Sequence, residues 1–83
     1  MIFTSDHGEE LGDHYMFRKC RPYEGSCHIP LIISGPKPLP LGGKEGQVCH
    51  NVVELRDLMP TFLDLAHAPV PEEVDGKSLL PMV

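Results

Sequence analysis

The chain has 83 residues, with 12 acidic side chains against 7 Lys and Arg, so its formal net charge is −5 with His neutral. That length allows one small domain at most, and the acidic balance argues against binding to a nucleic-acid backbone. No run reaches the roughly 18 apolar residues of a transmembrane helix, and no signal peptide is visible. Nine Pro, eight Gly and no Trp predict a loop-rich chain with little bulky material for a core.

The first residues already have the character of a strand. Met1 to Thr4 form a β-branched and aromatic run with no lead-in, which suits a buried strand. From this start we expect the chain to be part of a larger domain. Its three cysteines, Cys20, Cys27 and Cys49, are an odd number and fix no redox compartment.

The hydrophobic pattern predicts a second strand and two loop regions. Residues 30–34 are nearly all apolar, which predicts a strand buried on both faces, as in an α/β sheet. Before it, Pro22 is expected to begin a short helical turn over residues 23–26. After it, residues 35–47 are rich in Pro and Gly and are expected to form a loop. Residues 48–53 are expected to be extended.

One helix is predicted near residues 55–66, where apolar side chains recur every three or four positions. Asp57 is a candidate N-cap, and Pro60 then falls in the first turn, where a missing N–H costs little. Near the end of the chain, Ser78 is expected to cap a single helical turn through Leu79 and Leu80.

The end of the first strand carries the most informative residues. Asp6 and His7 follow it directly, at the carboxyl end of a strand, where α/β sheets place functional groups. A carboxylate and an imidazole on adjacent residues can share one metal ion if the turn bends sharply, and Gly8 allows that bend. The alternative is a turn Asp that caps backbone N–H groups beside a surface His.

A basic cluster lies further along the same region. Arg18, Lys19 and Arg21 stand out in an acidic chain, and near a bound metal they would suit an anionic substrate such as sulfate or phosphate. The alternative is a solvated basic turn that balances nearby carboxylates.

Several segments together carry a family resemblance. In chain order they are Phe-Thr-Ser-Asp-His-Gly-Glu at 3–9, Leu-Gly-Asp-His at 11–14, Lys19, Pro-Tyr-Glu-Gly-Ser at 22–26, Pro-Leu-Ile-Ile-Ser-Gly-Pro at 30–36, residues 53–66, and Asp-Gly-Lys-Ser-Leu-Leu-Pro at 75–81. In this order and spacing they closely resemble the type I sulfatases of the alkaline phosphatase superfamily. The resemblance covers nearly the whole chain.

The resemblance implies a fold and a domain layout. Residues 1–83 would be the C-terminal part of a sulfatase catalytic domain, an α/β fold of the alkaline-phosphatase type, in which helices sandwich a mostly parallel or mixed sheet. Within it, residues 5–28 would form the metal-ligand loop, residues 30–34 a strand and residues 55–66 a helix. The chain would need the N-terminal part of that domain for activity.

The resemblance also implies roles for particular residues. Asp6 and His7 match two metal ligands of the family, and Lys19 matches the lysine that contacts the substrate's sulfate or phosphate oxygens and acts in catalysis. His14 is carried over only as a substrate contact in the same loop. The substrate class implied is a sulfate ester, either a small molecule or a glycan. Family members are often exported, so localisation stays open.

The chain departs from the family pattern at the nucleophile. Sulfatases use a formylglycine made from Cys or Ser in a Cys/Ser-x-Pro-x-Arg motif. Residues 20–24 imitate that motif for three positions, but Glu24 stands where Arg is required, so Cys20 is interpreted as a loop residue. The formylglycine is expected upstream, and the isolated chain is expected to be inactive.

The metal and one alternative class stay open at this point. Calcium is the expected cation, since sulfatase sites usually hold this oxygen-preferring ion. The imidazole of His7 also suits manganese or zinc, as in related phosphonate and phosphodiester hydrolases. A small structural zinc module built from the Cys and His residues is a further alternative, although no Cys-x2-Cys or His-x3-His spacing supports it.

Overall fold

The computed structural model describes residues 1–35 and 46–82. They form two compact units, which divide near residue 36 and are described separately here. The predicted loop over residues 35–47 lies mostly outside the described residues, as does the last proline of the segment at 30–36. Among the residues that are described, no helix has the length and apolar character needed to cross a membrane.

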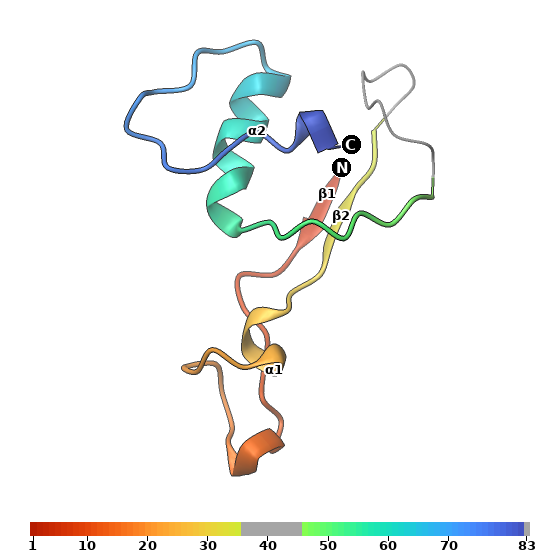
Figure 1. Cartoon of the computed structure of the whole chain (residues 1–83), viewed down its shortest axis with the longest axis vertical. Helices are drawn as coiled ribbons and strands as arrows, with labels where there is room; N and C mark the ends of the chain where they lie inside the picture. The colour runs from red at the N-terminus through yellow and green to blue at the C-terminus, as the bar shows by residue number, and fades with distance from the viewer. Residues whose placement is uncertain (36–45, 83) are drawn as a thin grey trace. The chain divides into compact units, whose positions relative to one another are not determined.

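The first unit is built on two short strands. Strand β1 (Ile2–Thr4) pairs antiparallel with strand β2 (Leu31–Ile33) (Figure 1). In this pairing Phe3 lies opposite Ile32. The backbone N–H of Ser34 donates to the carbonyl of Met1 at 2.9 Å, which extends the pairing by one position. Both predicted strands are confirmed, and each is slightly shorter than the apolar run that predicted it.

The predicted burial of the second strand on both faces is wrong for this unit. Ile32 is 54% exposed and its partner Phe3 is 55% exposed, while the alternate residues of both strands are half-buried. A two-stranded pair presents its two faces to opposite sides, and here one face is exposed while the other is half-buried. Within the described residues the chain therefore contains a two-stranded sheet and short helices, and not a layered sandwich.

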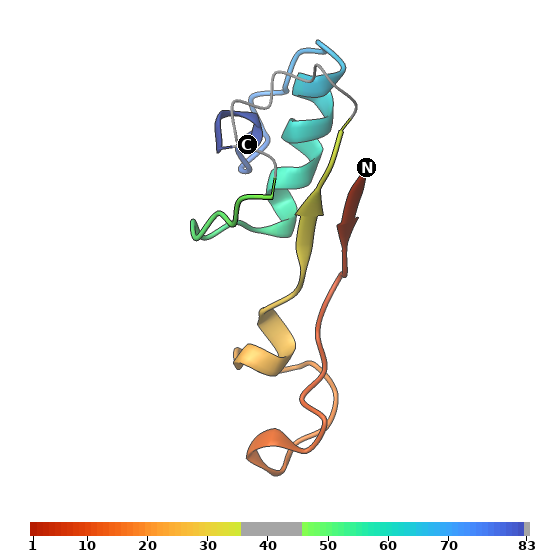
Figure 2. The ribbon, with the colours of Figure 1, turned by 90° about the vertical axis from the view of Figure 1, so that its right-hand side faces the viewer.

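The residues between the two strands extend beyond the strand ends as an arm (Figure 2). The arm contains the short 3₁₀ helix η1 (Asp13–Tyr15) and the single-turn helix α1 (Glu24–Cys27). Helix α1 begins later than Pro22 predicted, because Tyr23 has an extended backbone and serves as the N-cap. The arm carries the candidate metal ligands Asp6 and His7 and the candidate substrate contacts His14 and Lys19.

The second unit is organised around one helix. The 3₁₀ helix η2 (Leu55–Asp57) leads directly into α2 (Leu58–Leu65), which confirms the predicted helix, with Pro60 in its first turn. Asp57 holds the N-cap position of α2, as the sequence predicted, but its side chain makes no hydrogen bond to the first turn of that helix. Glu54 caps the helix instead, and Asp57 closes a capping box by accepting the Glu54 N–H at 2.9 Å. The difference arises because the chain becomes helical three residues earlier, as η2.

The core of the second unit is small and centred on Thr61. Thr61 and Pro60 are fully buried and Leu79 is 2% exposed. The Thr61 hydroxyl donates to the carbonyl of Asp57 at 2.6 Å and accepts the Leu79 N–H at 2.9 Å. The segment that leads into the terminal 3₁₀ helix η3 (Leu80–Met82) is thereby fixed to α2.

Two smaller predictions in the second unit have different outcomes. Ser78 Oγ accepts the Leu80 N–H at 3.3 Å at the start of η3, in agreement with its predicted capping role. Residues 48–53 belong to no helix or strand in the structure, and the extended backbone expected for them stays a prediction.

Candidate functional site

Asp6 and His7 lie in the turn that follows β1. Ser5 Oγ donates to the carbonyl of His7 at 2.7 Å, and His7 Nδ1 lies 2.7 Å from the carbonyl oxygen of Gly8. A carbonyl only accepts, so Nδ1 carries the proton in this contact. In the neutral ring, Nε2 then holds the free lone pair, and it lies 3.6 Å from Asp6 Oδ2.

This arrangement suits two ligands of one cation. Metal–ligand bonds of about 2.0–2.6 Å place neighbouring ligand atoms about 3 to 3.6 Å apart around one ion. The hydrogen bond from Nδ1 to a backbone carbonyl is the kind of contact that orients a ligating imidazole. Across residues 1–35 and 46–82, however, no group of three or more His, Cys, Asp and Glu side chains comes together to hold a metal. The described chain supplies a pair of candidate ligands and not a full set.

The turn is fixed against helix α1 by backbone contact. The Gly8 N–H donates to the carbonyl of Ser26 at 2.8 Å. A Cβ on Gly8 would overlap the carbonyl oxygen of Gly25, and a Cβ on Gly25 would come within 3.1 Å of the Glu9 carbonyl. Only residues without side chains allow this approach, so the Asp6-His7 turn and α1 form one packed junction.

A buried carboxylate reinforces the junction, and sequence reasoning did not single it out. Glu10 is 2% exposed and Ser26 is 5% exposed, and the Ser26 hydroxyl donates to Glu10 Oε1. Glu10 Oε2 is buried and has no hydrogen-bond partner among the described residues. Two adjacent glutamates after a turn suggest a solvated loop, and no local signal in the sequence marks one of them as buried.

Lys19 projects from the arm as an exposed cation. It forms no hydrogen bond or ion pair with any other residue in the described part of the chain. The residue before it is held on both sides. The Arg18 N–H donates to Glu9 Oε1, and the Arg18 carbonyl accepts the Glu10 N–H at 3.1 Å. Arg18 has φ 73°, a left-handed backbone that non-glycine residues rarely adopt.

His14 is held by an aromatic neighbour. Its ring stacks on that of Tyr23, with centroids 4.2 Å apart and an interplanar angle of 22°. His14 also has φ 53°, inside η1. The stack joins η1 to the residue that caps α1. No hydrogen bond or ion pair in the described residues connects His14 or Lys19 to Asp6 or His7.

An exposed pair on α1 was also missed from the sequence. His28 Nδ1 lies 2.7 Å from Glu24 Oε2, one helical turn apart. Together with Ile29 and Pro30 these side chains line a shallow surface pocket of the first unit. Their spacing of four residues brings them together across the turn of α1.

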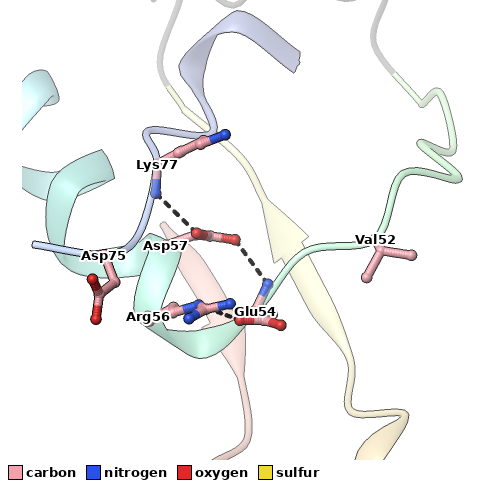
Figure 3. A pocket seen from close by; sticks show the side chains of 6 residues that line it. All are labelled: Val52, Glu54, Arg56, Asp57, Asp75 and Lys77. Carbon is pink, nitrogen blue, oxygen red and sulfur yellow. Dashed lines mark hydrogen bonds and ion pairs between the residues drawn. The ribbon is translucent and has the colours of Figure 1, made fainter.

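The second unit has its own polar pocket, which Figure 3 shows from close by. It is lined by Val52, Glu54, Arg56, Asp57, Asp75 and Lys77. Asp57 accepts the backbone N–H of Lys77 at 2.9 Å, and Arg56 forms an ion pair with Glu54. The backbone N–H groups of Lys77 and, to a smaller extent, Glu54 lower the pKa of Asp57. These contacts connect η2 to the turn at residues 75–78.

The cysteines take no part in either site. Cys20, Cys27 and Cys49 are free and exposed. The zinc-module alternative therefore gains no support from the described residues, which contain no Cys and His cluster of sufficient size.

Comparison with known proteins gives a consistent result. A family model described as "N-sulphoglucosamine sulphohydrolase, C-terminal" matches residues 12–83. An arylsulfatase of Clostridium perfringens is 51% identical over 82 residues, which is 99% of this chain and 17% of that protein. Arylsulfatase K of dog and of human are 49% and 45% identical, each over 99% of this chain and 14% of the relative. The chain thus spans between a seventh and a sixth of the length of these relatives.

Proposed function

Because the chain belongs to the sulfatase family and matches the C-terminal part of its domain, we propose that it supplies part of an active site for the hydrolysis of sulfate esters. The observation that carries the proposal is the Asp6-His7 pair, with Oδ2 and Nε2 3.6 Å apart. Its substrate would be an aryl sulfate or another sulfate ester, including a sulfated glycan. The whole domain would be an α/β/α sandwich, in which β1 and β2 belong to a larger sheet.

Asp6 and His7 would hold a divalent cation together with ligands from outside the described residues. When bound, such a cation neutralises charge on the sulfate oxygens and so favours attack at sulfur. The expected cation is Ca²⁺, with Mn²⁺ or Zn²⁺ as alternatives because one ligand is an imidazole nitrogen. The Nδ1 contact with Gly8 supports His7 as a ligand, since in the neutral ring it leaves the Nε2 lone pair free and near Asp6.

Lys19 and His14 would act on the substrate directly. The Lys19 ammonium is exposed, and its fixed positive charge would stabilise the charge that develops on the sulfate oxygens in the transition state. His14, held by its stack on Tyr23, would contact the bound ester. The nucleophile would be a formylglycine formed outside these 83 residues, and the isolated chain would therefore be inactive.

A phosphonate or phosphodiester hydrolase of the same superfamily is the second candidate. The observation that favours it is His7, because a nitrogen ligand suits manganese or zinc better than calcium. The two candidates differ in substrate, and a comparison of aryl sulfate with aryl phosphodiester turnover separates them.

The proposal is tested in the intact protein that carries these residues. Asp6→Asn keeps the side-chain size and removes the charge, so we expect loss of bound divalent metal and at least a hundredfold loss of aryl sulfate turnover. The matched control is Glu72→Gln, which removes one charge from an exposed residue of the second unit. Wild-type turnover and metal content in Asp6→Asn would contradict the metal assignment. Turnover of phosphodiesters but not of sulfates would favour the second candidate.

A further inference from the structure

Glu9 connects the backbone beside Lys19 to the Asp6-His7 turn. We infer that Glu9 is a positioning residue, which sets the direction of Lys19 by holding the backbone of Arg18. The inference rests on the proposed action of Lys19 on the substrate. The reaction would then depend on Glu9 as well as on the adjacent Asp6-His7 pair.

The contacts at Arg18 are the first step of the argument. Both backbone polar groups of Arg18 are engaged by consecutive glutamates: the N–H by the Glu9 carboxylate and the carbonyl by the Glu10 N–H, at 3.1 Å. Two contacts on one residue fix its orientation as well as its place. The direction in which the chain leaves Arg18 therefore depends on Glu9 and Glu10.

The backbone conformation of Arg18 is the second step. Its φ of 73° lies in the left-handed region, where a side chain with a Cβ is disfavoured. Residues in this region persist when surrounding contacts hold them there. The carboxylate of Glu9 is the side chain that supplies such a contact, because it accepts the Arg18 N–H. Without it, Arg18 would relax toward an ordinary backbone angle and Lys19 would point elsewhere.

The position of Glu9 is the third step. Glu9 follows Gly8, whose N–H is bonded to Ser26, and its own carbonyl packs against Gly25. Its backbone is thus anchored in the junction that also fixes His7. Lys19 is exposed and has no partner among the described residues that could hold it by itself. The contact between Glu9 and Arg18 therefore makes the position of Lys19 depend on the position of the junction.

The test is a double-mutant cycle in the intact protein, with kcat and KM measured for an aryl sulfate. Lys19→Ala is expected to lower kcat by about a hundredfold or more, and Glu9→Ala by about tenfold, with little change in KM. In the Lys19→Ala background, Glu9→Ala is expected to have almost no further effect, because its target is gone. Glu9→Gln keeps an acceptor oxygen for the Arg18 N–H and should retain most of the activity.

Two controls separate this role from a general loss of structure or of metal. Glu72→Ala removes the same charge from the second unit and should leave kcat unchanged. Metal content should be equal in Glu9→Ala and wild type, since Glu9 would act through Lys19 and not through Asp6. Additive effects of Glu9→Ala and Lys19→Ala, or a loss of metal in Glu9→Ala, would overturn the inference. A silent Lys19→Ala would overturn the proposed function and this inference with it.

Discussion

The backbone N–H of Lys77 donates a 2.9 Å hydrogen bond to Oδ1 of Asp57, twenty residues earlier in the chain. The other oxygen of the same carboxylate accepts the Glu54 N–H at 2.9 Å. Both bonds favour the ionised carboxylate, and they lower the pKa of Asp57, with the Lys77 contact as the larger cause. Asp57 thus joins the start of the helix to the turn that follows it.

Acid is expected to weaken the second unit through Asp57. The folded-state pKa lies below the ordinary value of 3.8, so the contribution of this group is complete above that value and is lost as pH falls through the lower folded pKa. Asp57→Asn should reduce the loss of thermal stability below about pH 4. Circular dichroism melts between pH 6 and 2.5 measure the pH dependence of thermal stability. The control is Asp75→Asn, a change at an exposed neighbour. An unchanged pH dependence in Asp57→Asn would contradict the role.

The Thr61 hydroxyl is expected to contribute strongly to the stability of the second unit. Thr61→Val keeps the shape but removes both hydrogen bonds, which leaves the buried Leu79 N–H without its acceptor. Stability should fall by about 1–3 kcal/mol, the cost of an unpaired buried donor. Urea denaturation measures the change. Thr4→Val, on strand β1 with only a 3.4 Å contact from its hydroxyl, should be close to neutral. Equal effects at the two positions would argue against this account.

Gly8→Ala is expected to open the junction between the Asp6-His7 turn and α1. A methyl group at Gly8 would overlap the Gly25 carbonyl, so the turn would have to move away from the helix. Metal affinity and turnover of the intact protein should fall by at least tenfold. Gly25→Ala meets its nearest atom at 3.1 Å and should cost less. Isothermal titration with Ca²⁺ and Mn²⁺ gives the affinities. A larger loss in Gly25→Ala would reverse the interpretation.

The stack between His14 and Tyr23 is expected to influence substrate binding. Tyr23→Phe keeps the ring on which His14 lies, whereas Tyr23→Ala removes it. Tyr23→Ala and His14→Ala should therefore raise KM for an aryl sulfate to similar extents, severalfold, while Tyr23→Phe stays near wild type. Steady-state kinetics of the three variants decide the point. If Tyr23→Phe behaved like Tyr23→Ala, the hydroxyl and not the stack would be the important feature.

The 83 residues alone are expected to show no turnover of sulfate or phosphate esters, because they contain only a pair of candidate metal ligands in their described part. The same residues should function in place of the segment they match in the Clostridium perfringens arylsulfatase, with which they are 51% identical. Aryl sulfate assays on the purified chain and on this chimera measure both expectations. Clear turnover by the chain alone would show that it needs no further residues.

The sequence predicted local structure well where the signal was local. Apolar runs located both strands, and the helical repeat located α2 with Pro60 in its first turn. The exposure of Phe3 and Ile32 could not be predicted from the apolar runs, because burial depends on what covers a strand and not on the strand itself. The roles of Asp6, His7, His14 and Lys19 remain predictions.

Contacts between distant residues account for the other differences. Asp is a preferred N-cap residue and Glu is not, yet Glu54 caps the helix, and the backbone of Lys77, twenty residues on, occupies the second oxygen of Asp57. Glu10 resembles any solvent-exposed glutamate until Ser26, sixteen residues later, covers it. Neither partner can be chosen from spacing alone.

The junction at Gly8 and Gly25 has a consequence for how such chains diverge. The two glycines fit backbone to backbone, so each position tolerates little else, whereas most side chains of the arm between them are exposed. Substitutions should therefore accumulate at the exposed positions between the two glycines, while the glycines themselves persist together. A sequence profile that requires both glycines and leaves the exposed positions between them free would recover distant relatives that a stricter pattern would miss.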